Sequence, residues 1–139
     1  MTPIFPRDAL RTLIGYWNAT GNYLAGAKVH LFTNQISISP TTPLTALTEA
    51  TFDGYSAASI TTWLTPYSDV LGNAILEAQI EQFLCTGSTV SETIYGAYLT
   101  NTLGTALLMA INFATPVHIT QAGDAVIFSP QVSLGQPPV

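Results

Sequence analysis

The stretch ETIYGAYLTNTLGTALLMAINF, residues 92–113, decides the fold class of this chain. Two strand-like runs, 93–100 and 105–113, flank the four residues NTLG. A short connection of this kind predicts a β-hairpin in which Gly104 takes a positive φ. The second run is apolar on both faces, with Leu107, Met109, Ile111 and Phe113 on one and Ala106, Leu108 and Ala110 on the other. Such a strand is expected in the centre of a sandwich or beneath another subunit.

The sequence around this hairpin is also typical of β-structure. From Ala27 onward Thr, β-branched and aromatic residues dominate, and Gly, Asn and Pro recur at short intervals. Pro40 and Pro43 predict that 35–43 is a loop or an edge segment, because proline cannot donate to a strand ladder. Further strands are expected at 27–34, at 55–63 after a turn at Asp53-Gly54, at 116–120, and as a last strand within 122–134, with a loop at 64–73.

The segment NAILEAQIEQFL, residues 73–84, fits two structures. Its residues favour a helix, yet Leu76, Ala78 and Ile80 alternate with Glu77, Gln79 and Glu81 as in a half-exposed strand. The surrounding β pattern favours the strand. The predicted fold is therefore all-β, a β-sandwich or jelly roll of about seven to eight strands over 26–134, followed by a tail at 135–139.

The N-terminal residues 1–25 are expected to form a short helix or arm. Pro6 and Asp8 suit the start of a helix over 7–17. Its apolar residues recur at i, i+3, i+4 and i+7, namely Leu10, Leu13, Ile14 and Trp17. Our hypothesis is a docking arm, in which these side chains insert into a neighbouring chain while Arg7 and Arg11 meet acidic groups there. A helix packed on its own domain is the alternative.

The charge of the chain limits its partners. The net charge is −5, and residues 29–139 hold no Lys or Arg. Nucleic-acid binding is therefore not expected, because phosphates are bound by clustered Lys and Arg. Charged residues make up 8% of the chain, against about 25% in a typical soluble protein. So few surface charges predict an oligomer or an assembly component.

A membrane location is not expected. The longest apolar stretch, 105–114, is shorter than the about 20 residues that a spanning helix needs. The N-terminus lacks the basic start and apolar core of a signal peptide, so synthesis in a cytoplasm is expected.

No motif for catalysis or for a cofactor is present, so we expect neither an enzyme nor a bound cofactor or metal. His30 and His118 are interpreted as structural or interface residues. Glu77 and Glu81 would share a strand face about 13 Å apart, which favours solvated side chains over an acid/base pair. Cys85 is expected to be buried near a strand end, and Asp124 to cap a turn.

Aromatic side chains could anchor the core and subunit contacts, or stack on sugars, and the first interpretation is preferred. They are Tyr16, Trp17, Tyr23, Phe32, Phe52, Tyr55, Trp63, Tyr67, Tyr95 and Tyr98.

Five sequence features, within residues 30–132, resemble short structural proteins of tailed bacteriophage virions. They are "LF-N" before a Thr-rich loop, "LTEA-F-GY", "TIYG-YLT", "G--LL-A--F--P" and "GD-V-F-P". The N-terminal helix and its arginines lie outside this resemblance. The resemblance implies a small β-rich virion protein that decorates the capsid or belongs to the tail or its fibres.

Together, composition and resemblance predict a non-enzymatic capsid decoration (cement) protein, a homo-oligomer that binds the major capsid protein in the virion. The alternative is a tail, collar or fibre component in contact with other tail proteins. That component would bind a host receptor or glycan through exposed aromatic side chains.

Overall fold

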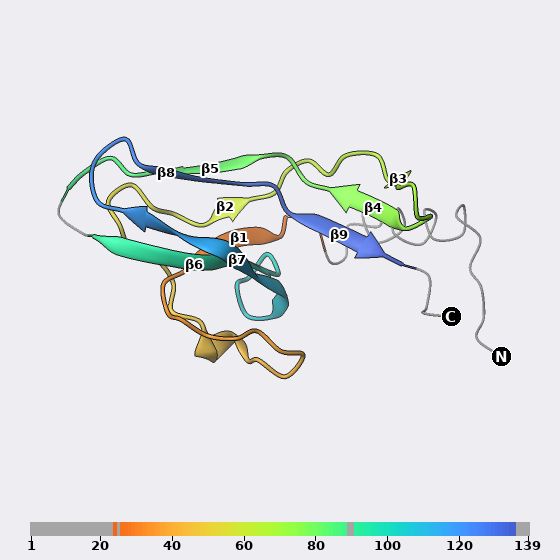
Figure 1. Cartoon of the computed structure of the whole chain (residues 1–139), viewed down its shortest axis with the longest axis horizontal. Helices are drawn as coiled ribbons and strands as arrows, with labels where there is room; N and C mark the ends of the chain where they lie inside the picture. Colours follow the sequence, from red (N-terminus) through yellow and green to blue (C-terminus); the bar gives the residue numbers. More distant parts are fainter. Residues whose placement is uncertain (1–23, 25, 89–90, 136–139) are drawn as a thin grey trace. The chain divides into compact units, whose positions relative to one another are not determined.

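A computed structural model describes residues 24, 26–88 and 91–135 of the chain. These residues form nine β-strands and one 3₁₀ helix, Leu44–Ala46 (Figure 1). The strands are β1 (Lys28–Phe32), β2 (Ala58–Ser59), β3 (Tyr67–Ser68), β4 (Ala74–Glu77), β5 (Glu81–Leu84), β6 (Glu92–Thr100), β7 (Leu107–Ile119), β8 (Ala125–Phe128) and β9 (Gln131–Leu134). The predicted all-β, sandwich-like class is confirmed. In this described part, no helix has the length and apolar character needed to cross a bilayer.

The chain divides into two compact units. The first unit comprises residues 1–25, 60–80 and 129–139, and its three-stranded antiparallel sheet has the order β3-β4-β9. The second unit comprises residues 26–59 and 81–128. It holds a four-stranded antiparallel sheet of order β2-β1-β6-β7 and a two-stranded sheet, β5-β8.

The second unit is built as two layers. The β5-β8 pair lies over the four-stranded sheet (Figure 1), and the ring of Phe113 on β7 meets that of Phe128 on β8 at 5.8 Å. In the four-stranded sheet β1 pairs with β6 along its whole length, from Lys28 opposite Thr100 to Phe32 opposite Gly96. Alternation along these two strands buries one set of small and branched side chains on a single face, namely Val29, Leu31, Ala97 and Leu99.

The opposite face of this sheet is covered by residues 33–49, the segment that follows β1 and is called the covering segment below. Phe32, Leu47 and Tyr98 form a buried cluster, against which Ile36, Ile38 and Leu44 pack. Asn34 holds this covering segment in place: its Nδ2 donates to the Ala46 carbonyl at 2.8 Å, and its Oδ1 accepts from the Thr48 amide at 2.7 Å. The predicted loop at 35–43 is confirmed, and its physical role is to bury the aromatic face of the sheet.

The predicted hairpin is present as β6 and β7. Gly104 has φ +72°, as expected for the turn. Asn101 closes the turn, because its Oδ1 accepts from the amides of Thr105 at 2.8 Å and Ala106 at 3.1 Å.

The strand expected at 116–120 is not separate but continues β7. Ile94 pairs with Val117 and Gly96 with Asn112, so β7 has four residues, 113–116, where β6 has only Tyr95. This bulge accommodates Pro116, which lacks an amide proton for the ladder.

The expectation that residues 105–113 form a central strand is wrong, because β7 is the edge of its sheet. Its two apolar faces have a different cause. Leu107 and Ala110 pack against the cluster under the covering segment, while Met109 and Ile111 lie on the other face. The apolar residues on both faces of β7 therefore reflect a loop that covers one face. They do not mean that β7 has a neighbouring strand at both of its edges. Coverage by another subunit stays a prediction.

Three other strand predictions are corrected. The strand expected over 55–63 shrinks to β2, and β3 forms inside the expected loop 64–73. Residues 73–84 are β-structure as preferred, but they form β4 and β5 in different sheets. The split comes at Ala78, whose amide donates to the Pro130 carbonyl at 2.8 Å and which bridges to Trp63. The expected last strand is likewise two strands, β8 and β9.

Asp124 caps a turn, as predicted, and this makes the β7–β8 connection sensitive to acid. Its Oδ2 accepts from the Thr120 amide at 2.8 Å, the Thr120 hydroxyl at 3.1 Å and the Gln121 amide at 3.1 Å. The hydrogen bond from the Thr120 backbone is the main reason why the pKa of Asp124 lies below its ordinary value of 3.8. In the unfolded chain the Asp124 carboxyl has its ordinary pKa. The stabilisation from its hydrogen bonds is therefore fully present at pH values above that ordinary pKa. It is lost as the pH falls through the lower pKa that Asp124 has in the folded protein.

We therefore expect Asp124→Asn to flatten the acid side of the stability profile. Chemical denaturation of both proteins, followed by circular dichroism from neutral pH down past 3.8, measures this dependence. The same acid dependence in the variant would contradict the assignment.

Candidate interaction surface

The residues predicted to form the docking arm lie outside the described part of the chain. They are Arg7, Leu10, Arg11, Leu13, Ile14 and Trp17. The docking arm, and its alternative of a helix packed on its own domain, stay predictions.

His30 joins two residues that are distant in the sequence. Its Nδ1 lies 2.7 Å from Glu49 Oε1, and its Nε2 lies 2.9 Å from Thr100 Oγ1. An ionised carboxylate only accepts, so Nδ1 carries the proton, and in the neutral ring Nε2 accepts from the Thr100 hydroxyl. The imidazole also stacks on the Tyr98 ring at 4.7 Å between centroids.

This carboxylate–imidazole–hydroxyl chain has the order of a hydrolase triad. Thr100, however, is only 1% exposed, so a substrate has no access to its hydroxyl. The hydrogen bonds instead tie the segment around Glu49 to β1 and β6, which is a structural role, as the sequence interpretation of His30 had it.

Two tyrosines extend this polar cluster without adding a reactive group. Tyr55 donates to Glu49 Oε1 at 2.9 Å and accepts from the Leu31 amide at 3.0 Å. Burial raises the pKa of Tyr55, and burial together with the Glu49 charge raises the pKa of Tyr98 to about 12. Both phenols therefore stay protonated near neutral pH and serve as hydrogen-bonding and packing groups.

The second histidine lies elsewhere. His118 is exposed on β7, with its Nδ1 3.0 Å from the Thr93 hydroxyl. Over residues 24, 26–88 and 91–135, no three His, Cys, Asp or Glu side chains are grouped as metal ligands would be.

Glu77 and Glu81 do not share a strand face, so that expectation is wrong: they belong to β4 and β5. Glu77 Oε1 accepts from the Tyr67 hydroxyl at 2.8 Å and from Gln131 Nε2 at 2.9 Å. Cys85 follows β5 and is buried, as predicted.

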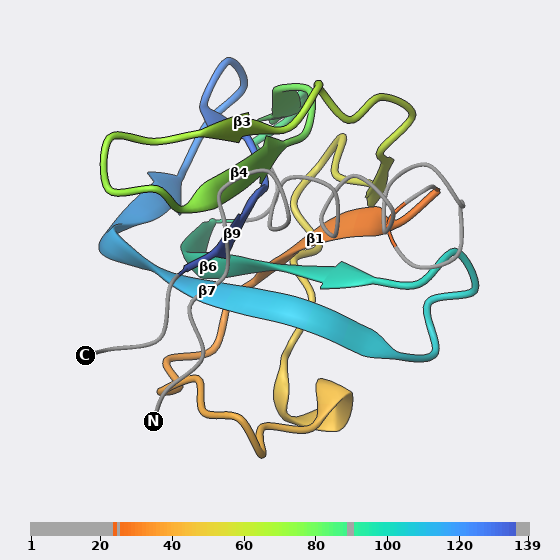
Figure 2. The same cartoon turned by 90° about the vertical axis from the view of Figure 1, so that its right-hand side faces the viewer.

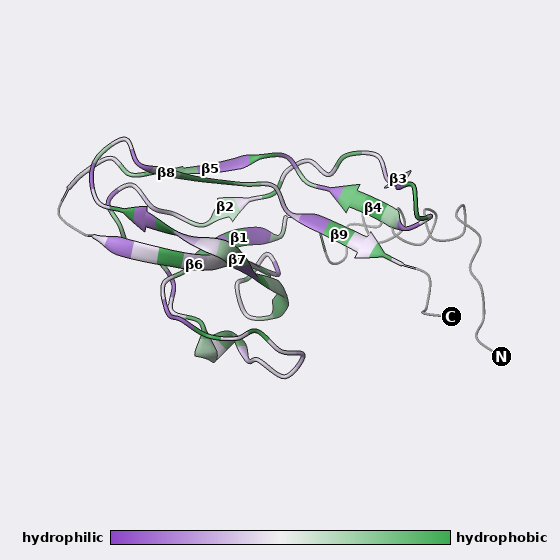
Figure 3. Ribbon diagram, viewed as in Figure 1, coloured by the Kyte–Doolittle hydropathy of each residue, from purple (hydrophilic) through white to green (hydrophobic). Residues whose placement is uncertain are grey.

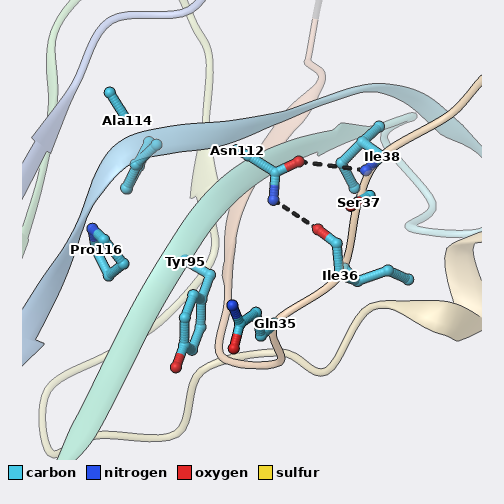
Figure 4. Close-up of a pocket in the computed structure, with 9 residues that line it drawn as sticks. Gln35, Ile36, Ser37, Ile38, Tyr95, Asn112, Ala114 and Pro116 are labelled. Atoms are coloured by element: carbon cyan, nitrogen blue, oxygen red, sulfur yellow. Dashed lines mark hydrogen bonds between the residues drawn. The ribbon is translucent and has the colours of Figure 1, made fainter.

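An open pocket of about 560 Å³ lies between the covering segment and β7 (Figure 4). Asn112 closes one end: its Nδ2 donates to the Ile36 carbonyl at 2.7 Å, and its Oδ1 accepts from the Ile38 amide at 3.3 Å. Tyr95 and Gln35 both line the pocket. With no acidic or basic side chain in its lining, the pocket offers hydrogen bonds and an aromatic face but no acid/base chemistry.

The most distinctive surface is the outer edge of the β6–β7 hairpin. From Thr93 to Gly123 the sequence contains no Lys, Arg, Asp or Glu. Ile111 is 51% exposed on the edge strand, and the start of β7 has the hydrophobic colour in Figure 3. Among the described residues, no other strand or backbone group pairs with the side of β7 that faces away from β6. Sequence reasoning offered coverage of this strand by another subunit as one of two alternatives, but it did not identify β7 as an edge strand, although the long run without charges was a signal for it.

Comparisons with known protein families, with curated proteins and with solved structures found no match to this chain.

Proposed function

We propose that the protein is a non-enzymatic structural subunit that acts by binding other protein chains in an assembly. The exposed, uncharged edge strand β7 carries this proposal. Soluble proteins usually protect long edge strands with charged side chains, because an open edge pairs with other chains. Over its thirteen residues β7 has Pro116 and a bulge but no Lys, Arg, Asp or Glu. An edge strand without charges is suited to a protein that functions with this edge covered by another chain.

The assembly we propose is the capsid of a tailed bacteriophage, where the chain would act as a decoration protein on the major capsid protein. The resemblance of residues 30–132 to virion proteins supports this choice, together with the low charge content of 8%. A decoration protein stabilises a shell by burying surface across joints between capsid subunits. Each Å² of apolar surface removed from water contributes roughly 25 cal/mol, and many copies add up without any chemical step.

Electron cryo-microscopy of virions carrying this chain tests the proposal, because it counts and locates the copies. We expect copies distributed over the whole shell, in contact with the major capsid protein. A few copies at one vertex or along the tail would contradict decoration and would favour a tail, collar or fibre component.

The pocket beside Tyr95 favours glycan binding as the second candidate function. A tyrosine ring with neighbouring amide side chains, here Gln35 and Asn112, combines a stacking surface with hydrogen-bonding groups. Saturation-transfer NMR with host-surface oligosaccharides measures such binding. Loss of the signal in Tyr95→Ala, but not in the control Tyr67→Ala, would support it. No signal with the native chain would contradict it.

A further inference from the structure

We propose that β7 of one copy pairs antiparallel with β7 of a second copy about a two-fold axis. The two four-stranded sheets would then join into one continuous sheet. This inference rests on the proposed function, since it names the partner that covers the edge strand.

The side of β7 that faces away from β6 has the geometry of an open sheet edge. Figure 2 shows β7 as the outermost strand of its sheet, beside β6. Residues 109–112 pair with β6 in unbroken register, from Met109 opposite Leu99 to Asn112 opposite Gly96. A register shift separates them from Leu107 opposite Thr100, and the larger bulge follows Asn112. In an edge strand every second residue points its N–H and C=O away from the sheet, where they need another partner. A two-fold axis perpendicular to the sheet places the same strand of a second copy there in the antiparallel orientation.

The charge distribution of the chain favours a second copy as the partner of β7. The chain carries −5, so two copies repel each other over most of their surfaces. Pairing about a two-fold axis brings like residues close together, and like charges opposite one another destabilise a strand pair. Between Thr93 and Gly123 there is no charged residue to cause this repulsion. A strand that binds a partner of opposite charge would carry charged side chains to pair with it, and β7 has no Lys, Arg, Asp or Glu.

The side chains that would meet across the two-fold axis are mostly apolar. Met109 and Ile111 lie on one face of β7, Ile111 is half exposed, and Leu107 and Ala110 lie on the other face. Two antiparallel copies of this segment would place apolar side chains opposite apolar side chains on both faces. Such cross-strand pairs stabilise a sheet, and they remove the exposed part of Ile111 from water.

An exposed apolar side chain in the turn of the same hairpin does not offer this contact. Leu103 is 81% exposed, but it lies in the hairpin turn, where Asn101 already satisfies the amides of Thr105 and Ala106. A turn of this kind has no free strand edge. Leu103 is therefore a suitable control, because it belongs to the same hairpin and is more exposed than Ile111.

Light scattering after size exclusion, over a dilution series of the full chain, tests the pairing. We expect the native chain to be a dimer, or a larger oligomer built from dimers. Ile111→Lys should weaken association about tenfold or more, because two introduced charges approach each other across the axis. Leu103→Lys should associate like the native chain. A monomeric native chain, or equal weakening in both variants, would overturn the inference.

Disulfide trapping then tests which strand lies at the interface. Cys85 is 1% exposed, so an introduced cysteine is the accessible thiol of the described residues. We expect at least one of the single variants from Leu107→Cys to Asn112→Cys to give a covalent dimer on mild oxidation, while Leu103→Cys does not. A dimer in solution that none of these variants traps would overturn pairing through β7.

The outcomes separate this inference from the proposed function. A native chain that is monomeric yet binds purified capsids would refute the homotypic pairing and leave the structural function supported. A chain that associates neither with itself nor with capsids or tails would overturn both.

Discussion

Replacing Gly96 with alanine is expected to lower the free energy of unfolding by about 3 kcal/mol, near the upper end for overpacked sites. Gly96 lies opposite Phe32 of β1 and opposite Asn112 of β7, in the middle of the four-stranded sheet. A Cβ here would lie 2.5 Å from Phe32 Cζ and would also meet the carbonyl oxygen of Ile111. The aromatic ring could turn away at some cost, but the carbonyl belongs to the backbone of β7 and cannot move without disturbing the ladder.

Urea unfolding monitored by far-ultraviolet circular dichroism measures this loss. Gly104→Ala is the matched control, because Gly104 has a positive φ but nothing within 4 Å of an added Cβ. It should cost only the about 1–2 kcal/mol of a left-handed backbone conformation. A smaller loss for Gly96→Ala than for Gly104→Ala would show that the sheet tolerates a side chain at residue 96.

Replacing His30 with alanine is expected to cost about 3 kcal/mol, from lost hydrogen bonds and the cavity that remains. The variant loses both ring hydrogen bonds, to Glu49 and Thr100, and the stacking on Tyr98. It also leaves the hydroxyl of Thr100 buried without its partner, which is costly in a site closed to water.

Thermal and urea unfolding of His30→Ala and His118→Ala together provide the test. His118 is an exposed histidine on β7 with one hydrogen bond to Thr93, so its loss should change the free energy of unfolding by about 0.5 kcal/mol or less. The loss of unfolding free energy in Glu49→Gln should fall between the losses in His30→Ala and His118→Ala, because the Glu49 side chain is 43% exposed. Equal stability of the two histidine variants would mean that the hydrogen-bond chain does not hold the covering segment on the sheet.

The hairpin of β6 and β7 was predictable because its information is local. The alternation of side chains over 93–100 and 105–113, and a glycine after NTL, specify two strands and a tight turn without reference to the rest of the chain. The turns at Gly54 and Gly104 were predicted for the same reason, and both glycines have positive φ in the structure.

The candidate surface was less predictable than the fold. The predicted arm residues, such as Arg7 and Trp17, were chosen because helical periodicity is easy to recognise. The edge of β7 was missed because apolar faces reveal which side chains are buried, but they do not reveal which strand lies alongside. The partners of His30 were also hidden, since Glu49 and Thr100 are 19 and 70 residues away.

By itself, the sequence determined the β-class, the main hairpin, the turns that need glycine or a capping carboxylate, and the low charge of the whole chain. These features depend on backbone preferences and on side chains within a few residues of one another. Only the tertiary structure decided that β7 is an edge strand, that residues 73–84 divide between two sheets, and that 125–134 form two strands. Strand order depends on pairing between segments that are far apart in the sequence. The backbone hydrogen bonds that join strands form with almost any sequence, so they do not specify which strand lies beside which.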